Sequence, residues 1–309
     1  MASEHVAVDV PKDNDAKDNE ELQYLATIGR ILAEGDWRDG RNGRVISCPG
    51  VKMVWSLEGG TLPLLTSKRV FWKGVKEELL WLLSGSTYAP DLAARGVHIW
   101  DANATREFLD GRGLTSNVEG DLGPVYGYQW RHWGHPYEGV FDEEGRRISY
   151  AGKGVDQIQA LIDTLKRDPA SRRMVVNAWN VGDLDRMALP PCHMFFQFHV
   201  GARGLSCMMY QRSADWGLGV PFNIASYSLL THMVASVVGI PAYQFIHFVG
   251  DAHIYEDHVE ALTSQATRAL HPFPTIEIAK RETIDDITSE DIVLHGYVHS
   301  GALKMNMAA

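Results

Sequence analysis

Cysteine is scarce in this chain of 309 residues, which contains only Cys48, Cys192 and Cys207. Three cysteines so far apart are too few for a disulfide framework or a four-cysteine zinc site, so a reducing cytoplasm is the default setting. The nucleus is a second compartment if the source is eukaryotic. Basic charge is also in short supply, because 29 lysines and arginines face 39 acidic residues. A net charge of −10 argues against a surface that binds nucleic acid, so local arginines must hold any anionic ligand.

Long apolar segments are missing as well. The most apolar stretch, residues 225–240, contains two serines, a threonine and a histidine, and it is shorter than the roughly 20 residues that a membrane span needs. The N-terminus lacks the basic and apolar regions of a secretory signal and the arginines of a transit peptide. We therefore expect no membrane insertion, and we interpret residues 1–21 as a disordered acidic tail. No repeat or linker divides residues 22–309.

The order of apolar patterns indicates an α+β domain rather than regular βαβ repeats. The predicted helices cover residues 22–32, with Gly35 as the stop, and residues 75–83, 158–165 and 229–237, the last being buried on several sides. The predicted strands cover residues 174–179, 194–200 and 204–211, with a hairpin-like turn between the last two. Residues 35–50 predict a mobile basic loop, and residues 101–155 predict loops around a few short elements.

The segment ALPPCHMFFQF places Cys192 at the start of a predicted strand, behind two prolines. A cysteine in this position is more often a small core residue than a nucleophile, and the segment alone leaves both interpretations open. A nucleophilic thiol needs positive charge nearby, for which Arg172, Arg173 and Arg212 are candidates. Arg212 is followed by Ser213, and such a pair can chelate a phosphate monoester, although a single arginine is more often part of a surface ion pair.

Other polar residues suggest contacts to a small ligand. Asn223 offers the amide donor and acceptor that match the edge of uracil, although an asparagine here is more often a helix N-cap. His253 and Tyr255 lie two residues apart, so on a strand they would face the same side and share one ligand hydroxyl. A metal site at His253, Asp257 and His258 is a weaker alternative. The chain lacks a Walker loop, a GxGxxG segment after a strand and an HExxH motif.

Together these segments resemble the folate-dependent thymidylate synthases. The resemblance runs from residue 22 to the C-terminus and includes EGDLGPVYGYQWRHWG, MALPPCHMFFQF, QRSADWGLGVPFNIASYS and GDAHIYEDH. It implies one α+β catalytic domain over residues 22–309, in which a large twisted mixed β-sheet is flanked by helices and packs back to back in an obligate homodimer. The implied activity is that of a methyltransferase that converts dUMP to dTMP, with 5,10-methylenetetrahydrofolate as donor of carbon and hydride and dihydrofolate as second product. No metal is implied.

The resemblance also implies a role for each matching residue. Cys192 is the nucleophile that adds to C6 of uracil, and the catalytic groups around it are Glu78, Tyr126, His193, Arg212 and Asp215. The dUMP site comprises Arg41, Arg172, Arg173, Arg212, Ser213, Asn223, His253 and Tyr255, with Arg172 and Arg173 reaching it from the partner subunit. The folate pocket comprises Lys68, which faces the acidic folate tail, together with Ile99, Trp100, Asn103, Asp215, Leu218, Gly219, Phe222 and Ala309.

Two segments depart from the family pattern. DGRNGRV is one residue shorter than the usual phosphate loop, so Arg41 is the best match for the phosphate arginine and Arg38 is the second. The chain ends in KMNMAA, so Ala309 stands where the family has a valine whose carboxylate helps to close the site. Related pyrimidine hydroxymethylases add water where a synthase transfers hydride, so exclusion of water decides the product. Trp100 and Asn103 favour the synthase, and a uracil hydroxymethylase and an inactive nucleotide-binding relative are the alternatives.

Overall fold

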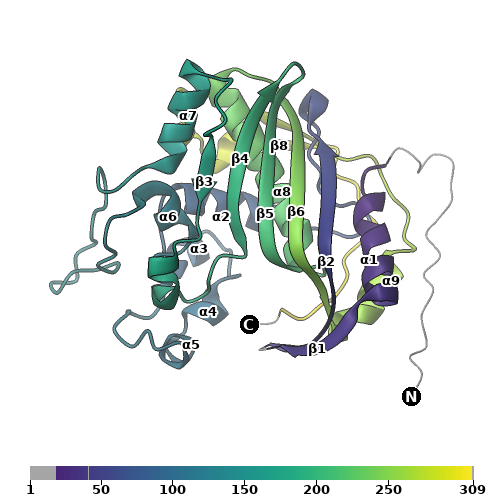
Figure 1. Ribbon diagram of the computed structural model, residues 1–309, viewed down its shortest axis with the longest axis horizontal. Helices are drawn as coiled ribbons and strands as arrows, with labels where there is room; N and C mark the ends of the chain where they lie inside the picture. The colour runs from purple at the N-terminus through teal and green to yellow at the C-terminus, as the bar shows by residue number, and fades with distance from the viewer. Residues whose placement is uncertain (1–18, 41, 308–309) are drawn as a thin grey trace.

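The computed structural model describes residues 19–40 and 42–307, and its main feature is a twisted sheet of six strands (Figure 1). The strands follow the order β1-β2-β6-β5-β4-β3. β5 and β6 are parallel and the other neighbours are antiparallel, so the sheet is mixed, as predicted. The strand bounds are β1 Asp36–Gly40, β2 Gly43–Ser56, β3 Val175–Asn177, β4 His193–Gly201, β5 Gly204–Asp215 and β6 Ala242–Tyr255. β7 Thr275–Ile278 and β8 Ile292–His295 form a separate antiparallel pair.

Helices cover one face of the large sheet. α8 packs on β5 and β6, and α2 packs on α8, so both lie behind the sheet in Figure 1. The helix bounds are α1 Leu22–Glu34, α2 Trp72–Leu83, α3 Ala89–Ala93, α4 Asp101–Ala104, α5 Arg106–Gly111, α6 Tyr126–His132, α7 Gln157–Arg167, α8 Gly219–Val238 and α9 Val259–Gln265. Of the elements in the described part of the chain, no helix crosses the face of the sheet that is turned toward the viewer in Figure 1. Among the same residues, no helix is long and apolar enough to cross a membrane.

The apolar spacing of the sequence is reflected in the helices. α1 and α7 bury the residues that recur every three or four positions, including Ile28 and Leu161, and leave their other faces polar. α8 begins ten residues earlier than the apolar spacing from Leu229 predicted, because its residues are buried on nearly all sides and give no periodic signal for its start. The prediction that this helix is buried on several sides is confirmed.

Two predicted boundaries need correction. Residues 35–50 predicted a mobile basic loop leading into a strand, and the strand is present as β2, but residues 36–40 and 43–47 are paired as a hairpin from Asp36 opposite Ser47 to Gly40 opposite Gly43. The glycines favoured a loop, but pairing with β6 extends β2 through this segment. Glu21, which we assigned to the tail, is fully buried and accepts hydrogen bonds from the backbone and side chains of Thr66 and Ser67. The remainder of the predicted tail, residues 1–18, lies outside the described residues.

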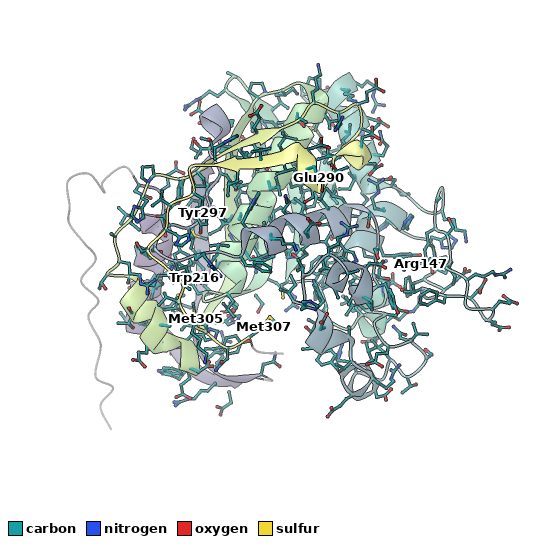
Figure 2. The ribbon with its side chains drawn as sticks, turned by 180° about the vertical axis from the view of Figure 1, so that it is seen from behind. Arg147, Trp216, Glu290, Tyr297, Met305 and Met307 are labelled. Carbon is teal, nitrogen blue, oxygen red and sulfur yellow. The ribbon has the colours of Figure 1, made fainter. Side chains whose placement is uncertain are left out.

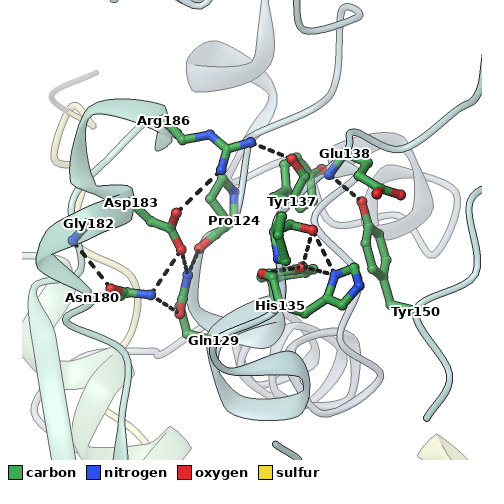
Figure 3. A network of polar contacts seen from close by, with 12 residues as sticks. Pro124, Gln129, His135, Tyr137, Glu138, Tyr150, Asn180, Gly182, Asp183 and Arg186 are labelled. Atoms are coloured by element: carbon green, nitrogen blue, oxygen red, sulfur yellow. Dashed lines mark hydrogen bonds and ion pairs between the residues drawn. The ribbon is translucent and has the colours of Figure 1, made fainter. Parts of the chain in front are cut away.

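A polar network fixes α6, the helix that carries Tyr126 into the site (Figure 3). Gln129 on α6 donates to the Asp183 carboxylate at 2.8 Å, and Asn180 donates to the same carboxylate at 3.0 Å. Arg186, in the same short helical segment as Asp183, donates to the backbone carbonyl of Tyr137. The irregular segment after α6 is thus tied to the residues that precede β4, and of the latter Leu189 and Pro190 line the cleft described below.

Candidate active site

Two adjoining cavities meet at Cys192, one of about 650 Å³ and one of about 440 Å³. Both are lined by Trp100, Tyr126, Leu189, Cys192, Ser213 and Asp215. The larger cavity extends toward the β1–β2 hairpin and the end of β6, and the smaller one extends toward α2 and the start of α8. A ligand in each cavity would therefore meet the other at the cysteine.

Cys192 lies immediately before β4, on a backbone that is held from two sides. Its N–H donates to the Tyr126 hydroxyl at 2.8 Å, and its carbonyl accepts from the Arg212 N–H at 2.8 Å. The Arg212 guanidinium donates to the carbonyls of Pro190 and Pro191 at 2.9 Å, and its Nη2 lies 3.9 Å from the cysteine Sγ. The carbonyls of the two prolines thus orient the Arg212 guanidinium toward the sulfur. This guanidinium supplies the positive charge that a nucleophilic cysteine requires.

His193 and Tyr126 form a stacked pair beside the cysteine, with ring centroids 4.1 Å apart. His193 Nδ1 lies 2.6 Å from the Tyr227 hydroxyl, so the imidazole is held on its other side as well. Burial lowers the pKa of His193 to about 3, and His247 contributes to the same shift. Burial and the nearby Cys192 raise the pKa of Tyr126 well above its usual value. Both groups are therefore neutral at neutral pH and act through hydrogen bonds.

Glu78 on α2 is the carboxylate nearest to this pair in the smaller cavity. It accepts a hydrogen bond of 2.7 Å from the Trp100 indole N–H. Burial raises the pKa of Glu78 to about 7, although the Trp100 contact opposes this shift. A carboxyl group with a pKa near 7 can both give and take a proton at physiological pH, which is the property required of a general acid or base.

The alternative interpretation of Asn223 as a helix N-cap is wrong, because α8 begins before it and Leu218 is the N-cap residue. The Asn223 Oδ1 accepts from the Gln211 side chain at 3.1 Å, and Gln211 Oε1 lies 2.9 Å from His247 Nε2. Gln211 and His247 are buried. This chain of side chains fixes the orientation of the Asn223 amide, which lines the smaller cavity together with Cys192.

The far end of the larger cavity is polar and charged. His253 and Tyr255 face the same cavity, as predicted, with ring centroids 5.5 Å apart. His253 Nδ1 lies 3.1 Å from Asp251 Oδ1, and this contact is the main reason that the pKa of Asp251 is lowered. Arg38 donates to both Asp251 and Ser47. Asp251 thus anchors a histidine on one side and an arginine on the other.

The smaller cavity contains all the predicted folate residues that the structure describes: Lys68, Ile99, Trp100, Asn103, Asp215, Leu218, Gly219 and Phe222. Asp215 accepts from the N–H groups of Gly217, Leu218 and Gly219 at 2.8, 3.2 and 3.3 Å. The Nδ2 of Asn103 is buried and has no hydrogen-bond partner within the described chain, so it is available to a ligand. Lys68 is buried and its ammonium donates to the Gly217 carbonyl, and burial lowers its pKa to about 8.

Four predicted site residues are not placed in this cleft. Arg172 and Arg173 are exposed in the segment before β3, and neither lines the two cavities in the part of the chain that the structure describes. Arg41 and Ala309 lie outside the described residues. Among residues 19–40 and 42–307, no group of three or more histidine, cysteine, aspartate or glutamate residues is arranged to hold a metal ion.

The sequence interpretation missed the residues that support the site, namely Gln211, Tyr227, His247 and Asp251. Gln211 carried a usable signal, because it shares period-two spacing with Ser213 and Asp215 on β5 and all three line the smaller cavity. Tyr227 is one helical turn after Asn223 on α8, which places it on the same side of the helix. Asp251 carried the same kind of signal, because it lies two residues before His253 on β6. His247 gave no usable signal, because only the pairing of β5 with β6 brings it beside Gln211.

A thiol beside a guanidinium, at the junction of two cavities, is the arrangement expected of an enzyme with a cysteine nucleophile and two small-molecule ligands. Comparison with known proteins gives the family. The thymidylate synthase family model matches residues 22–309. The chain is 52% identical over 290 residues to the thymidylate synthase of Herpesvirus ateles, covering 93% of this chain and 98% of that protein. It is 51% identical over 290 residues to the thymidylate synthase of Homo sapiens, covering 93% and 90%.

A longer relative gives the same result. The bifunctional dihydrofolate reductase–thymidylate synthase of Leishmania major is 50% identical over 296 residues, which cover 94% of this chain and 56% of that protein. The chain belongs to the thymidylate synthase family. The family resemblance of the sequence and the predicted fold class, a mixed sheet flanked by helices, are thereby confirmed.

Proposed function

We propose that the chain catalyses the reductive methylation of dUMP to dTMP with 5,10-methylenetetrahydrofolate, which leaves as dihydrofolate. The observation that carries this proposal is the position of Cys192, whose Sγ lies beside Arg212 at the junction of a polar and a more apolar cavity. The nucleotide would occupy the larger cavity and the folate the smaller one. The family membership of the chain supports the same assignment.

Polar groups of the larger cavity, together with Asn223 from the smaller one, suit the three parts of the nucleotide. Arg212 and Ser213, with Arg41, would bind the phosphate, because a guanidinium and a hydroxyl match its oxygens. His253 and Tyr255 would hold the sugar 3′-hydroxyl from the same side. The Asn223 Oδ1 already accepts from Gln211, and its second lone pair would accept from uracil N3–H while Nδ2 donates to O4.

The residues around the pyrimidine ring would carry out the proton transfers. The Cys192 thiolate forms a bond to C6 of uracil, and the displaced electron pair moves to C5 and O4. Glu78, with a pKa of about 7, would stabilise the charge at O4 through a proton or a water. C5 would then bond to the one-carbon unit of the folate, and Tyr126, held 2.8 Å from the Cys192 N–H, would take part in removal of the C5 proton as tetrahydrofolate leaves. Hydride transfer from the tetrahydrofolate to the resulting exocyclic methylene then expels the thiolate. His193 stays neutral and keeps Tyr126 in place by stacking.

The smaller cavity fits a folate in shape and polarity. Ile99, Trp100 and Phe222 supply apolar and aromatic walls, and the unpartnered Nδ2 of Asn103 offers a donor to the pterin. Asp215 would accept from the pterin N–H groups, which complete the bonding of its carboxylate. The bound folate supplies the one-carbon unit and the hydride. Lys68 would turn from the Gly217 carbonyl to the acidic folate tail.

We further propose that the enzyme is a homodimer in which the open face of the sheet is the interface. Phe195, Tyr210 and Val175 lie on this side of their strands and are 39%, 37% and 42% exposed, a large apolar surface for a face that no described helix covers. Arg172 and Arg173 lie beside the same face, next to β3. Two copies packed through this face would place the arginines of one subunit near the phosphate site of the other.

Mixing two inactive variants tests the shared site. Cys192→Ala removes the nucleophile and Arg173→Ala removes a phosphate contact from the opposite subunit, so mixed dimers contain one site with both residues intact. We expect each variant alone to be impaired and the refolded mixture to regain activity. A mixture that stays as impaired as the separate variants would reject the shared site.

The absorbance rise of dihydrofolate tests the reaction itself. Purified protein with dUMP and methylenetetrahydrofolate should give that rise together with dTMP. Turnover of dUMP without dihydrofolate would identify a hydroxymethylase, and tight dUMP binding without turnover would identify an inactive relative. The proposed setting is the cytoplasm, because the reaction requires Cys192 to remain a free thiol.

A further inference from the structure

The C-terminal segment is tied to the folate side of the site through His258, a residue to which the proposed mechanism gives no role. The His258 ring is 1% exposed, and its Nε2 lies 2.7 Å from the backbone carbonyl of Asn306. Asn306 also donates from its side chain to Asp257 at 3.3 Å. Met305 and Met307 lie on the same segment, which runs past Trp216 on the back of the molecule (Figure 2). Met307 lines the smaller cavity.

The other nitrogen of His258 faces the turn that carries Asp215. His258 Nδ1 is buried, has no hydrogen-bond partner among the described residues, and lies 3.7 Å from Asp215 Oδ1. This separation is too long for a hydrogen bond but short enough for electrostatic attraction. Burial disfavours the charged imidazole, but Asp215 and the Asn306 carbonyl outweigh it and raise the pKa of His258. The charged form would place an N–H toward each partner.

Gly217 is the point where these contacts meet. A Cβ at Gly217 would lie 2.5 Å from His258 Nδ1 and 3.1 Å from Met305 Sδ, so the histidine and the C-terminal segment pack directly on this glycine. The Gly217 N–H donates to Asp215, and its carbonyl accepts from Lys68. One residue thus touches the groups proposed to bind the pterin, the acidic folate tail and the C-terminal segment.

The ring of His258 also continues the row of rings from the nucleotide site. Its centroid lies 5.6 Å from that of Tyr255, which lies 5.5 Å from that of His253. His253 and Tyr255 line the larger cavity, whereas Asp215 and Met307 line the smaller one. His258 is therefore in contact with the sugar end of the nucleotide site and with the segment that borders the folate site.

We propose that His258 is a positioning residue that fastens the C-terminal segment against the Asp215 turn through its Nε2 contact to Asn306, and thereby shapes the folate site without contacting either substrate. The proposal rests on the proposed function for its kinetic consequence only. The fastening itself is a property of the protein without ligands, so it can be tested separately.

Two substitutions separate the two nitrogens of His258. In His258→Gln the amide nitrogen can take the place of Nε2, and in His258→Asn it can take the place of Nδ1. We expect His258→Asn to increase hydrogen exchange in the C-terminal segment of the ligand-free protein by about tenfold, the effect of losing one buried hydrogen bond. His258→Gln should restore most of the protection. Equal protection in wild type and His258→Asn would overturn the proposal.

Kinetic and binding measurements should show different effects of the substitution on the two substrates. We expect His258→Asn to raise the KM for methylenetetrahydrofolate by about tenfold while the Kd for dUMP changes less than about twofold. Equal losses for both substrates would show a general disturbance and reject the specific role. If the wild-type protein forms no dihydrofolate, the proposed function fails, but the exchange result still decides whether His258 fastens the segment.

His232 provides a matched control, because its Nε2 lies 2.9 Å from the Thr61 carbonyl at a similarly buried position on α8. His232→Asn should lower stability without changing exchange in the C-terminal segment. If His258→Asn does not fold, a protein truncated after Met305 tests the same contact from its other side. This truncation should shift the imidazole NMR signals of His258, and unchanged signals would contradict the contact.

Discussion

The pyrimidine end of the cleft, which lies beside the smaller cavity, and the phosphate end, which lies in the larger cavity, treat charge in opposite ways. At the pyrimidine end, burial raises the pKa of Glu78 to about 7 and lowers that of His193 to about 3, so both side chains are pushed toward their neutral forms. At the phosphate end, the contact with His253 lowers the pKa of Asp251, and Arg38 adds to the effect. Here Asp251 is partly exposed and lies between His253 and Arg38, so its ionised form is favoured.

This difference separates proton transfer from anchoring. A group that moves protons at physiological pH must have both of its forms accessible, and desolvation at the pyrimidine end provides this for Glu78. A group that binds phosphate must keep its charge at every working pH, and ion pairs at the other end provide this. We therefore expect substitutions at the pyrimidine end to affect turnover and those at the phosphate end to affect binding.

Removal of the nucleophile should have the largest effect. Cys192→Ala should reduce turnover by more than about 10⁴-fold, since no other group can form the bond to C6. Binding of dUMP should persist, because its proposed contacts come from other residues. Steady-state assays and calorimetric titration would measure the two quantities. Cys207→Ala is the matched control, because Cys207 is buried in β5 and should affect stability rather than chemistry. Full activity of Cys192→Ala would refute the assignment of the nucleophile.

Glu78→Gln should follow as the next largest loss. The amide keeps the shape and an acceptor for the Trp100 indole but cannot transfer a proton, so we expect kcat to fall by about 10²–10³-fold. The KM for dUMP should change little. Glu77→Gln is the control, since Glu77 is the adjacent buried carboxylate and contacts Ser289 and Arg95 outside the site. Equal losses in both variants would indicate that α2 is disturbed rather than that Glu78 transfers protons.

The pKa of Glu78 should also appear in the stability of the protein. Between pH 4.5 and about 7 the unfolded chain ionises Glu78 while the folded chain keeps the proton, so the free energy of unfolding falls as pH rises and the loss is complete above about pH 7. Glu78→Gln removes this loss. The variant should gain about 3 kcal/mol relative to wild type across that window in denaturant titrations. A difference that does not vary with pH would show that Glu78 is not desolvated.

The next largest effect concerns specificity at the pyrimidine end. Asn223→Asp should reduce the preference for dUMP over dCMP by at least about tenfold, because a protonated carboxyl can reverse the donor and acceptor pattern. The Gln211 amide, which donates to Asn223 Oδ1, can donate to the carboxyl as well. The ratio of kcat/KM for the two nucleotides measures the change. An unchanged ratio would show that the edge of uracil is read by another group.

The sequence predicted those parts of the fold that have a periodic or compact signal. α1 and α7 follow from the spacing of Ile28 and Leu161 with their neighbours, and the β4–β5 hairpin follows from two apolar runs around a short turn. The β1–β2 hairpin could not be predicted in the same way, because its residues are mostly exposed and glycine-rich. It exists because β6 pairs with β2 and extends it.

The residues of the site likewise divide into those that the sequence predicted and those that it did not. The residues proposed to touch ligands lie in segments that resemble the family, and most of them line the two cavities. The residues that hold them are Gln211 and His247 for the amide of Asn223, and Asp251 for His253. The contacts of Gln211 with Asn223 and His247 depend on which elements become neighbours in the fold, and a single sequence carries no direct signal for them. Asp251 lies two residues before His253 on the same strand, so its contact was open to prediction. The residues that fix the orientation of a ligand-binding side chain were therefore harder to predict than that side chain itself.

The smallest expected effect lies at the phosphate end. Arg38 is already paired with Asp251 and its side chain is 55% exposed, so Arg38→Ala should change the free energy of unfolding by less than about 1 kcal/mol. The KM for dUMP should rise by no more than about threefold, and this rise should diminish at high salt because the charge is screened. Arg41→Ala, measured beside it, should raise KM more. A larger rise with Arg38→Ala than with Arg41→Ala would make Arg38 the principal phosphate arginine of the shortened segment. The Arg38 guanidinium would then be shared between Asp251 and the phosphate of the substrate.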